Sequence, residues 1–258
     1  MKKTLFFAAL LFLIQLGFTQ DIDDENQSVV SFEAQLVNRY IWRGLDIAGN
    51  MPFVHPCIEL NLGSEKHAVT LGLWGAYSIG KQFDEELDLY LTYTFKEMFE
   101  LTVTDYFLYD NSPTGYDLFN YKDGETPHMI EGMIGFAGTE KFPVSLQFAM
   151  ILYGADARKI NSDGTEGGII YSKYIELGYE KELKGSTMTL FLGAVPDKAN
   201  EDMGEETFYG TTAPGIINVG CSFEKELKIS NQFSCVMNAG IITNPVEKSA
   251  FMVVGLTF

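Results

Sequence analysis

Most residues that could do chemistry in this sequence are carboxylates and arginines at the polar positions of alternating segments. The run Asn38-Arg39-Tyr40-Ile41-Trp42-Arg43-Gly44 ends the first segment and carries two arginines. If the segments close into a sheet, such charges face its interior and need water or partners of opposite sign. Water predicts a pore in which carboxylates attract cations and arginines set the field across a constriction, whereas pairing predicts a filled interior. The lining residues expected are Glu33, Arg39, Arg43, Glu59, Trp74, Asp88, Glu131 and Glu176.

Signatures of catalysis and metal binding are sparse. His55-Pro56-Cys57 places an imidazole and a thiol on one strand face, which is the minimum for a Cys–His pair, but no orienting acid or oxyanion motif accompanies it. No G-x-S-x-G, H-E-x-x-H, Walker loop or dinucleotide fingerprint is present, and the cysteines lack zinc-finger spacing. We therefore predict no enzyme activity, no catalytic residue, no cofactor and no metal. Cys57, Cys221 and Cys235 are expected to remain free thiols, with Cys57 pointing inward.

The elements that must position these residues are short alternating segments. After residue 27 the sequence breaks into about twelve stretches of roughly ten residues with period-two polarity, separated by turn residues. Segments of this length, tilted by about 40°, can cross the thin apolar band of an outer membrane. The expected strands are 28–42, 52–63, 67–80, 85–96, 98–109, 126–137, 143–153, 169–181, 186–195, 214–224, 228–241 and 247–258.

The connections between these segments alternate in length. Short turns are expected at 63–66, 96–97, 138–141, 182–185 and 225–227, and long loops at 43–51, 110–125, 154–168 and 196–213. Barrels of the outer membrane keep short turns in the periplasm, so both termini are predicted to be periplasmic. The near repeat of Glu180-Lys-Glu-Leu-Lys-Gly-Ser186 in Glu224-Lys-Glu-Leu-Lys-Ile-Ser230 predicts the same turn in two hairpins.

Apolar and aromatic residues indicate which face meets lipid. Leu87, Leu89 and Leu91 share one parity, opposite to Asp88. Aromatic residues gather near both ends of the segments, as two interfacial girdles require. Tyr40 and Trp42 are expected in the outer girdle. Arg39 and Arg43 would then face inward, and we expect Arg39 to pair with Glu33 or Glu59. The apolar face of segment 98–109 contains one exception, Asp105.

The two ends of the sequence agree with export and closure. A basic start, an apolar run over 5–16 and the small residues Gly17 and Thr19 predict a signal peptide over residues 1–19. An acidic leader is expected over 20–27 and the barrel over 28–258. The final residues place Met252, Val254 and Phe258 on one face, as expected of a closing strand that meets lipid.

The charge balance excludes one class of partner. Eighteen basic and 35 acidic residues give a net charge of −17, which becomes −19 when Lys2 and Lys3 leave with the predicted signal peptide. Nucleic-acid binding needs a basic surface, so no nucleic acid is expected. Without EF-hand spacing, the acidic loops are expected to be solvated and to attract cations rather than to form a calcium site. Their carboxylates are Asp110, Asp117, Asp123, Glu125, Asp197, Glu201, Asp202, Glu205 and Glu206.

The 38–44 run, of the form N-x-Y-x-W-R-G soon after a signal peptide, resembles the TorF-type porins, also called the Gcw_chp family, of Gram-negative outer membranes. Leu73-Trp74-Gly75 and the terminal Phe258 are similar to that family too, and the resemblance extends over the whole mature chain. It implies an outer-membrane barrel and a pore, and it carries over no catalytic site.

These patterns together predict an all-β protein, a transmembrane antiparallel up-and-down β-barrel of about twelve strands in the cell outer membrane. Nothing in the sequence identifies an oligomer interface. Twelve strands lie between filled eight-stranded barrels and the open large porins, which favours a passive, narrow, cation-preferring pore for small solutes or ions, surrounded by outer-membrane lipid. The alternatives are a non-conducting structural or surface-interaction barrel that uses its acidic loops, a barrel enzyme, and a secreted soluble β-sandwich.

Overall fold

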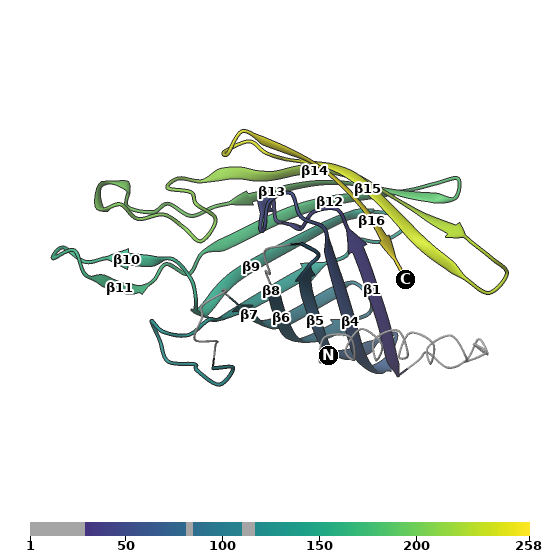
Figure 1. The fold of residues 1–258 in the computed structure, drawn as a ribbon, viewed down its shortest axis with the longest axis horizontal. Helices are drawn as coiled ribbons and strands as arrows, with labels where there is room; N and C mark the ends of the chain where they lie inside the picture. Colours follow the sequence, from purple (N-terminus) through teal and green to yellow (C-terminus); the bar gives the residue numbers. More distant parts are fainter. Residues whose placement is uncertain (1–28, 81–84, 110–116) are drawn as a thin grey trace.

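The barrel predicted from the alternating segments is confirmed. The computed structural model describes residues 29–80, 85–109 and 117–258, in which twelve antiparallel strands form a closed barrel (Figure 1). The predicted signal peptide and acidic leader lie outside the described residues. The barrel strands are β1 (Val30–Val37), β4 (Phe53–Ser64), β5 (His67–Ser78), β6 (Glu85–Phe95), β7 (Phe99–Tyr109), β8 (His128–Phe136), β9 (Val144–Gly154), β12 (Lys173–Leu183), β13 (Ser186–Val195), β14 (Gly215–Lys228), β15 (Ser234–Asn244) and β16 (Ser249–Thr257).

Strands that are neighbours in the sequence are also neighbours in the wall, and β1 pairs with β16 to close it. Gln35, Leu36 and Val37 of β1 lie opposite Thr257, Leu256 and Gly255. Beyond β1 the side chain of Asn38 continues the ladder, because its Oδ1 accepts from Val254 N at 2.8 Å and its Nδ2 donates to the Met252 carbonyl at 3.1 Å. The closing role predicted for the last strand is therefore confirmed.

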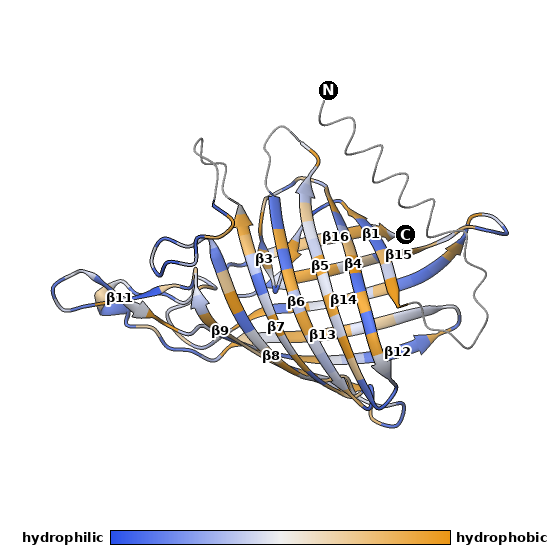
Figure 2. Cartoon of the chain, turned by 90° about the horizontal axis from the view of Figure 1, so that it is seen from below, coloured by the Kyte–Doolittle hydropathy of each residue, from blue (hydrophilic) through white to orange (hydrophobic). Residues whose placement is uncertain are grey.

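The outer wall is apolar on every side of the barrel. Successive side chains on a strand point to opposite faces, so one residue in two of each strand lies outside. Figure 2 shows hydrophobic and hydrophilic residues alternating along the strands. All twelve strands carry at least one exposed large hydrophobic residue, for example Phe32, Ile58, Leu71, Leu89, Leu101, Ile134, Leu146, Leu177, Leu190, Phe223, Ile241 and Met252.

Several strand boundaries differ from those predicted, and the differences at the ends of β1 and β14 change how the strands are connected. β1 ends at Val37 rather than at 42, because the chain then turns into the barrel. β14 continues to Lys228, so the turn predicted at 225–227 is wrong, and Cys221 pairs with Ile241. The repeat misleads here because Gly185, with φ +73°, forms the first turn, whereas Ile229 holds the equivalent place in the second copy.

The longer connections carry the remaining elements. β2 (Ile41–Trp42) pairs with β3 (Leu45–Asp46) within the connection from β1 to β4. β10 (Arg158–Ile160) and β11 (Glu166–Ile169) form a hairpin that projects beyond the barrel wall (Figure 1). A short 3-10 helix, η1 (Glu201–Met203), lies between β13 and β14.

None of the described residues belongs to a helix that is long and apolar enough to cross a membrane.

Candidate functional site

The candidate site is the lumen at the level where residues 38–52 cross it. This segment contacts inward-facing residues on widely separated strands: Tyr40 packs beside Trp74 of β5, whereas Gly44 lies against Ile217 of β14. A segment that reaches both of these strands must cross the interior. The three buried apolar clusters found among the described residues also meet there, since Trp42 packs against each of them.

A two-residue turn places the tip of this segment. Arg43 and Gly44 connect β2 to β3 with φ values of +50° and +82°, the left-handed conformation that such hairpin turns need. A Cβ on Gly44 would lie 2.0 Å from the Ile217 carbonyl oxygen, so only glycine fits against β14 at this position. A positive φ is unfavourable for Arg43, which unlike glycine has a Cβ, and the contacts of its side chain maintain this strained conformation.

The guanidinium of Arg43 is held on every side. Its two terminal nitrogens donate to the two carboxylate oxygens of Glu131 on β8, at 2.5 and 2.8 Å, and one also donates to Tyr209 Oη at 2.8 Å. The guanidinium carbon lies 4.5 Å from the ring centre of Trp42 and 4.8 Å from that of Tyr174. Both charged side chains are buried, with exposed fractions of 9% and 2%. The two charges neutralise each other, and this bidentate ion pair attaches the crossing segment to the wall.

Aromatic rings surround this ion pair. Trp42 stacks on Tyr209 with ring centres 5.8 Å apart, and it meets Tyr106 and Phe208 edge-on. Phe208 and Tyr209 come from the connection between β13 and β14, so two loops from the same end of the barrel meet inside it. This packing contradicts the predicted place of Trp42, and of the buried Tyr40, in an outer girdle. The alternation rule does not apply to them because the chain has left the wall.

The structure places the other predicted lining residues as follows. Glu59 accepts hydrogen bonds from Tyr90 Oη at 2.5 Å and Ser31 Oγ at 3.3 Å, on the same inward face as Glu33. Trp74 packs on His55, with ring centres 4.8 Å apart, and its cross-strand neighbour Asp88 is buried with Oδ1 unpaired.

The pairing predicted for Arg39 is wrong. Arg39 donates to Asp46 Oδ2 at 3.0 Å and Asn50 Oδ1 at 2.8 Å, both in its own connection, rather than to Glu33 or Glu59. Its guanidinium also lies over the Phe251 ring of β16. Because the connection folds back on itself after Val37, Arg39 finds local partners before it can reach the wall carboxylates.

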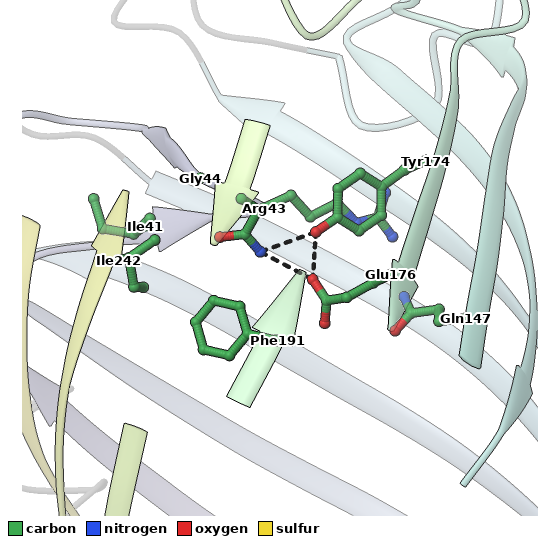
Figure 3. A pocket seen from close by; sticks show the side chains of 9 residues that line it. Ile41, Arg43, Gly44, Gln147, Tyr174, Glu176, Phe191 and Ile242 are labelled. Atoms are coloured by element: carbon green, nitrogen blue, oxygen red, sulfur yellow. Dashed lines mark hydrogen bonds between the residues drawn. The ribbon is translucent and has the colours of Figure 1, made fainter. Parts of the chain in front are cut away.

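A cavity of about 230 Å³ lies between the crossing segment and the wall (Figure 3). Tyr174 donates to Glu176 Oε2, and Asn218 Nδ2 donates to the same oxygen and to Tyr174 Oη, each at 2.9 Å. Glycines make room for the rings: a Cβ on Gly193 would lie 2.0 Å from Tyr174 Oη. The nine lining residues are Ile41, Arg43, Gly44, Gln147, Tyr174, Glu176, Phe191, Asn218 and Ile242.

Carboxylates of the long connections tie these loops to one another. Asp197 accepts from Lys173 Nζ at 2.6 Å, and Asp123 pairs with Arg158 at 2.5 Å, which lowers the pKa of the Asp123 carboxyl below its ordinary value. Glu205 accepts from the backbone N–H groups of Ile160 and Asn200, at 2.8 and 3.0 Å, and these bonds lower its pKa. Some of the acidic residues expected to be solvated therefore hold the connections β7–β8, β9–β12 and β13–β14 to one another. The described residues of these three connections are called the loop cap below.

His55 and Cys57 do share the inward face of β4, as predicted, but each takes a different partner. His55 Nδ1 lies 3.3 Å from Gln35 Oε1, and Cys57 Sγ lies 3.4 Å from Tyr90 Oη. All three cysteines are free. Within residues 29–80, 85–109 and 117–258, no three His, Cys, Asp or Glu side chains are grouped so that they could hold a metal ion.

Several residues of the site could not be singled out in the sequence. Tyr174 shares the inward parity of Glu176 on β12, and Tyr106 has the parity opposite to that of the outward Asp105 on β7, but nothing in the sequence distinguishes them from other strand aromatics. Phe191 and Asn218 likewise belong to strands with mixed inner faces. Tyr209 lies in a loop, where alternation gives no orientation, and no local signal identifies it.

No protein-family model matches the sequence, and no curated protein matches it significantly. Among solved structures, the chain is similar to the COG4313 outer membrane channel from Pseudomonas putida F1, with a TM-score of 0.42, 14% identity, and coverage of 92% of this chain and 98% of that one. It is also similar to the translocator domain of the autotransporter NalP from Neisseria meningitidis, with a TM-score of 0.37, 11% identity, and coverage of 99% and 95%. Likenesses this distant assign no function.

Proposed function

We propose that the protein is an outer-membrane barrel that passes small cations and cationic solutes through a narrow pore, constricted where residues 38–52 cross the lumen. The apolar outer wall supports the membrane location, because soluble proteins rarely expose contiguous apolar patches larger than a few hundred Å². If the barrel is oriented as outer-membrane barrels are, its short turns and both termini are periplasmic, and its long connections face the outside of the cell. The resemblance of the 38–44 run to TorF-type porins agrees with this proposal, and Arg43 of that run lies at the constriction.

The observation that carries the proposal is the charge imbalance of the lumen. The inward faces of the strands carry Glu33, Glu59, Asp88, Glu131 and Glu176. The basic side chain that reaches them, Arg43, is already neutralised by Glu131. Wall carboxylates without cationic partners lower the energy of a passing cation and raise that of an anion, as rings of Asp and Glu do in cation-selective pores.

The test is the conductance of refolded protein in a planar bilayer, with the reversal potential measured under a salt gradient. We expect a cation-selective current whose selectivity weakens in Glu59→Gln, because that change removes one lumen charge and keeps the side-chain shape. Glu65→Gln, in the exposed turn between β4 and β5, is the matched control and should leave the reversal potential unchanged. A non-selective current, or equal effects of the two substitutions, would contradict the proposal.

One observation favours a second candidate, a barrel kept closed by residues 38–52. The Trp42 ring is enclosed by Tyr106, Phe208 and Tyr209, so the crossing segment is packed as a plug would be. A folded wild-type barrel that passes no current, together with a Trp42→Ala variant that does, would select this candidate. The same pair of recordings therefore separates a constriction from a plug.

A further inference from the structure

The cavity beside the crossing segment has the chemistry of a binding site. It has a polar side and an apolar side: in Figure 3 Glu176 and Gln147 lie across the space from Ile41, Ile242 and Phe191. With about 230 Å³, the cavity is smaller than the pockets of about 300–1,000 Å³ that hold drug-sized ligands, so a smaller organic molecule is of suitable size.

The polar side of the cavity offers hydrogen-bond acceptors. Glu176 Oε2 is used by Tyr174 and Asn218, which are neutral donors, and Glu176 has no cationic partner within 4 Å among the described residues. Because a carboxylate only accepts, the amide of Asn218 must point its nitrogen at Glu176. This orientation leaves Asn218 Oδ1 in the cavity wall, buried and without a partner. An unpaired buried acceptor costs free energy that a donor group could recover.

Arg43 does not cancel the charge of Glu176. Both terminal nitrogens of Arg43 are directed at Glu131, and the two charges offset each other. The remaining charge at the cavity is the carboxylate of Glu176. On the opposite side the Phe191 ring lies against Gly220, where a Cβ would come within 2.2 Å of Phe191 Cζ. This leaves the ring as an apolar surface that could also attract a cation.

From this arrangement we infer that the cavity binds a small organic ammonium ion with an apolar tail, whose head pairs with Glu176 and whose tail packs on Phe191 and Ile242. The inference rests on the proposed function, since it names the class of solute that the cationic pore would select. An anion would be repelled by Glu176, and a neutral alcohol of the same shape would lack the ion pair. The site therefore distinguishes solutes by head-group charge.

The experiment is a calorimetric titration of phenethylammonium into the full-length barrel, folded in an uncharged detergent at about pH 7, where alkyl amines are protonated. A titration into empty micelles is subtracted. Phenylacetate and 2-phenylethanol serve as ligands of similar size with a negative and a neutral head group. We expect saturable binding of the amine alone, weakened at least about tenfold in Glu176→Gln, the effect of losing one ion pair of about 1.4 kcal/mol.

Glu180→Gln is the matched control, because Glu180 is also on β12 but does not line the cavity, and the substitution removes the same charge. Ile242→Trp fills the cavity while leaving every polar group in place, and it should abolish binding in a barrel that still shows heat-modifiable migration. No saturable binding to the wild type, equal binding of the three ligands, or equal binding to Glu176→Gln would overturn the inference. If the barrel binds the amine but passes no current, the proposed pore is contradicted and the binding site is supported. If it passes a cation-selective current but does not bind the amine, the binding site is contradicted and the pore is supported.

Discussion

At the scale of single residues, strand alternation was sufficient for the five wall carboxylates, although it breaks down at the register shift in β14, where the adjacent Ile217 and Asn218 are both buried. Glu33, Glu59, Asp88, Glu131 and Glu176 face inward as predicted because period-two geometry fixes the direction of each side chain. The same rule failed for Tyr40 and Trp42, since the turn at Arg43 and Gly44 belongs to a segment outside the sheet. The sequence could place the carboxylates and Arg43 in the interior, but not the pairing of Arg43 with Glu131.

Asp105, the exception on an apolar outer face, has a structural explanation. Its Oδ1 lies 2.8 Å from His128 Nδ1, and its Oδ2 accepts from Tyr121 Oη at 2.6 Å. The Tyr121 ring stacks on His128 with ring centres 4.0 Å apart, so residues 117–127, which precede β8, fold over the outside of the wall. A carboxylate that would be costly beside lipid is thereby paired and covered. The contacts of Asp105 with Tyr121 and His128 explain why a carboxylate lies on this apolar face, and no local pattern in the sequence predicts them.

The Arg43–Glu131 pair permits a prediction at this scale. Arg43→Ala or Glu131→Ala should each lower the free energy of unfolding by about 3–5 kcal/mol, because each leaves a buried charge without its partner. The double variant should lose less than the sum of the two, since removing both charges leaves neither unpaired. Urea unfolding followed by tryptophan fluorescence measures these values.

The control for this cycle is Arg39 with Asp46, a pair of the same kind whose side chains are 20% and 22% exposed. Because these side chains are more exposed than those of Arg43 and Glu131, Arg39→Ala should lower the free energy of unfolding by less than Arg43→Ala does. Strictly additive losses for Arg43 and Glu131, or a loss for Arg43→Ala no larger than for Arg39→Ala, would show that the pair does not hold the crossing segment.

At the scale of elements, the turn residues decided which predictions succeeded. Short turns between β4 and β5, β6 and β7, and β12 and β13 lie where the sequence placed them. The hairpin of β14 and β15 did not, because it lacks the glycine of its near repeat. The packing of the long connections was beyond prediction, since it depends on contacts between loops far apart in the sequence, such as Asp123 with Arg158.

The loop cap should loosen in acid. Glu205 joins the β13–β14 connection to β10, and two backbone donors lower its pKa below the ordinary value of 4.5. A lowered pKa means that the contact stabilises the folded loops above the pKa of the unfolded chain and is lost as the pH falls through the lower, folded value. Amide protection factors at Ile160 and Asn200, measured from neutral pH to about pH 3, should therefore fall below about pH 4.5.

Glu205→Gln should remove this dependence on pH, because an amide oxygen accepts hydrogen bonds without titrating in this range. Glu206→Gln changes the adjacent carboxylate, which makes neither bond, and should leave the dependence intact. Unchanged protection down to about pH 3 in the wild type would mean that other contacts hold the two loops together.

At the scale of the whole molecule, the two faces of one wall have opposite requirements. The outer face is apolar around the full circumference, whereas the inner face carries carboxylates and aromatic rings arranged around the crossing segment. Neighbouring residues of a single strand therefore experience different solvents if the barrel lies in a membrane, and similar ones if it lies in water. This contrast makes the membrane location testable with two substitutions at adjacent positions.

Leu190 and Thr189 of β13 are such a pair. Leu190 is exposed on the outer wall, and Thr189 faces inward opposite Glu180. In lipid vesicles Leu190→Arg should lower the free energy of unfolding by about 2–4 kcal/mol, the cost of a charge near the bilayer midplane. Thr189→Arg should cost far less, because the new charge meets water or Glu180. In water an arginine on the outer wall would instead be well solvated, so a neutral Leu190→Arg, or equal losses at the two positions, would contradict a membrane barrel.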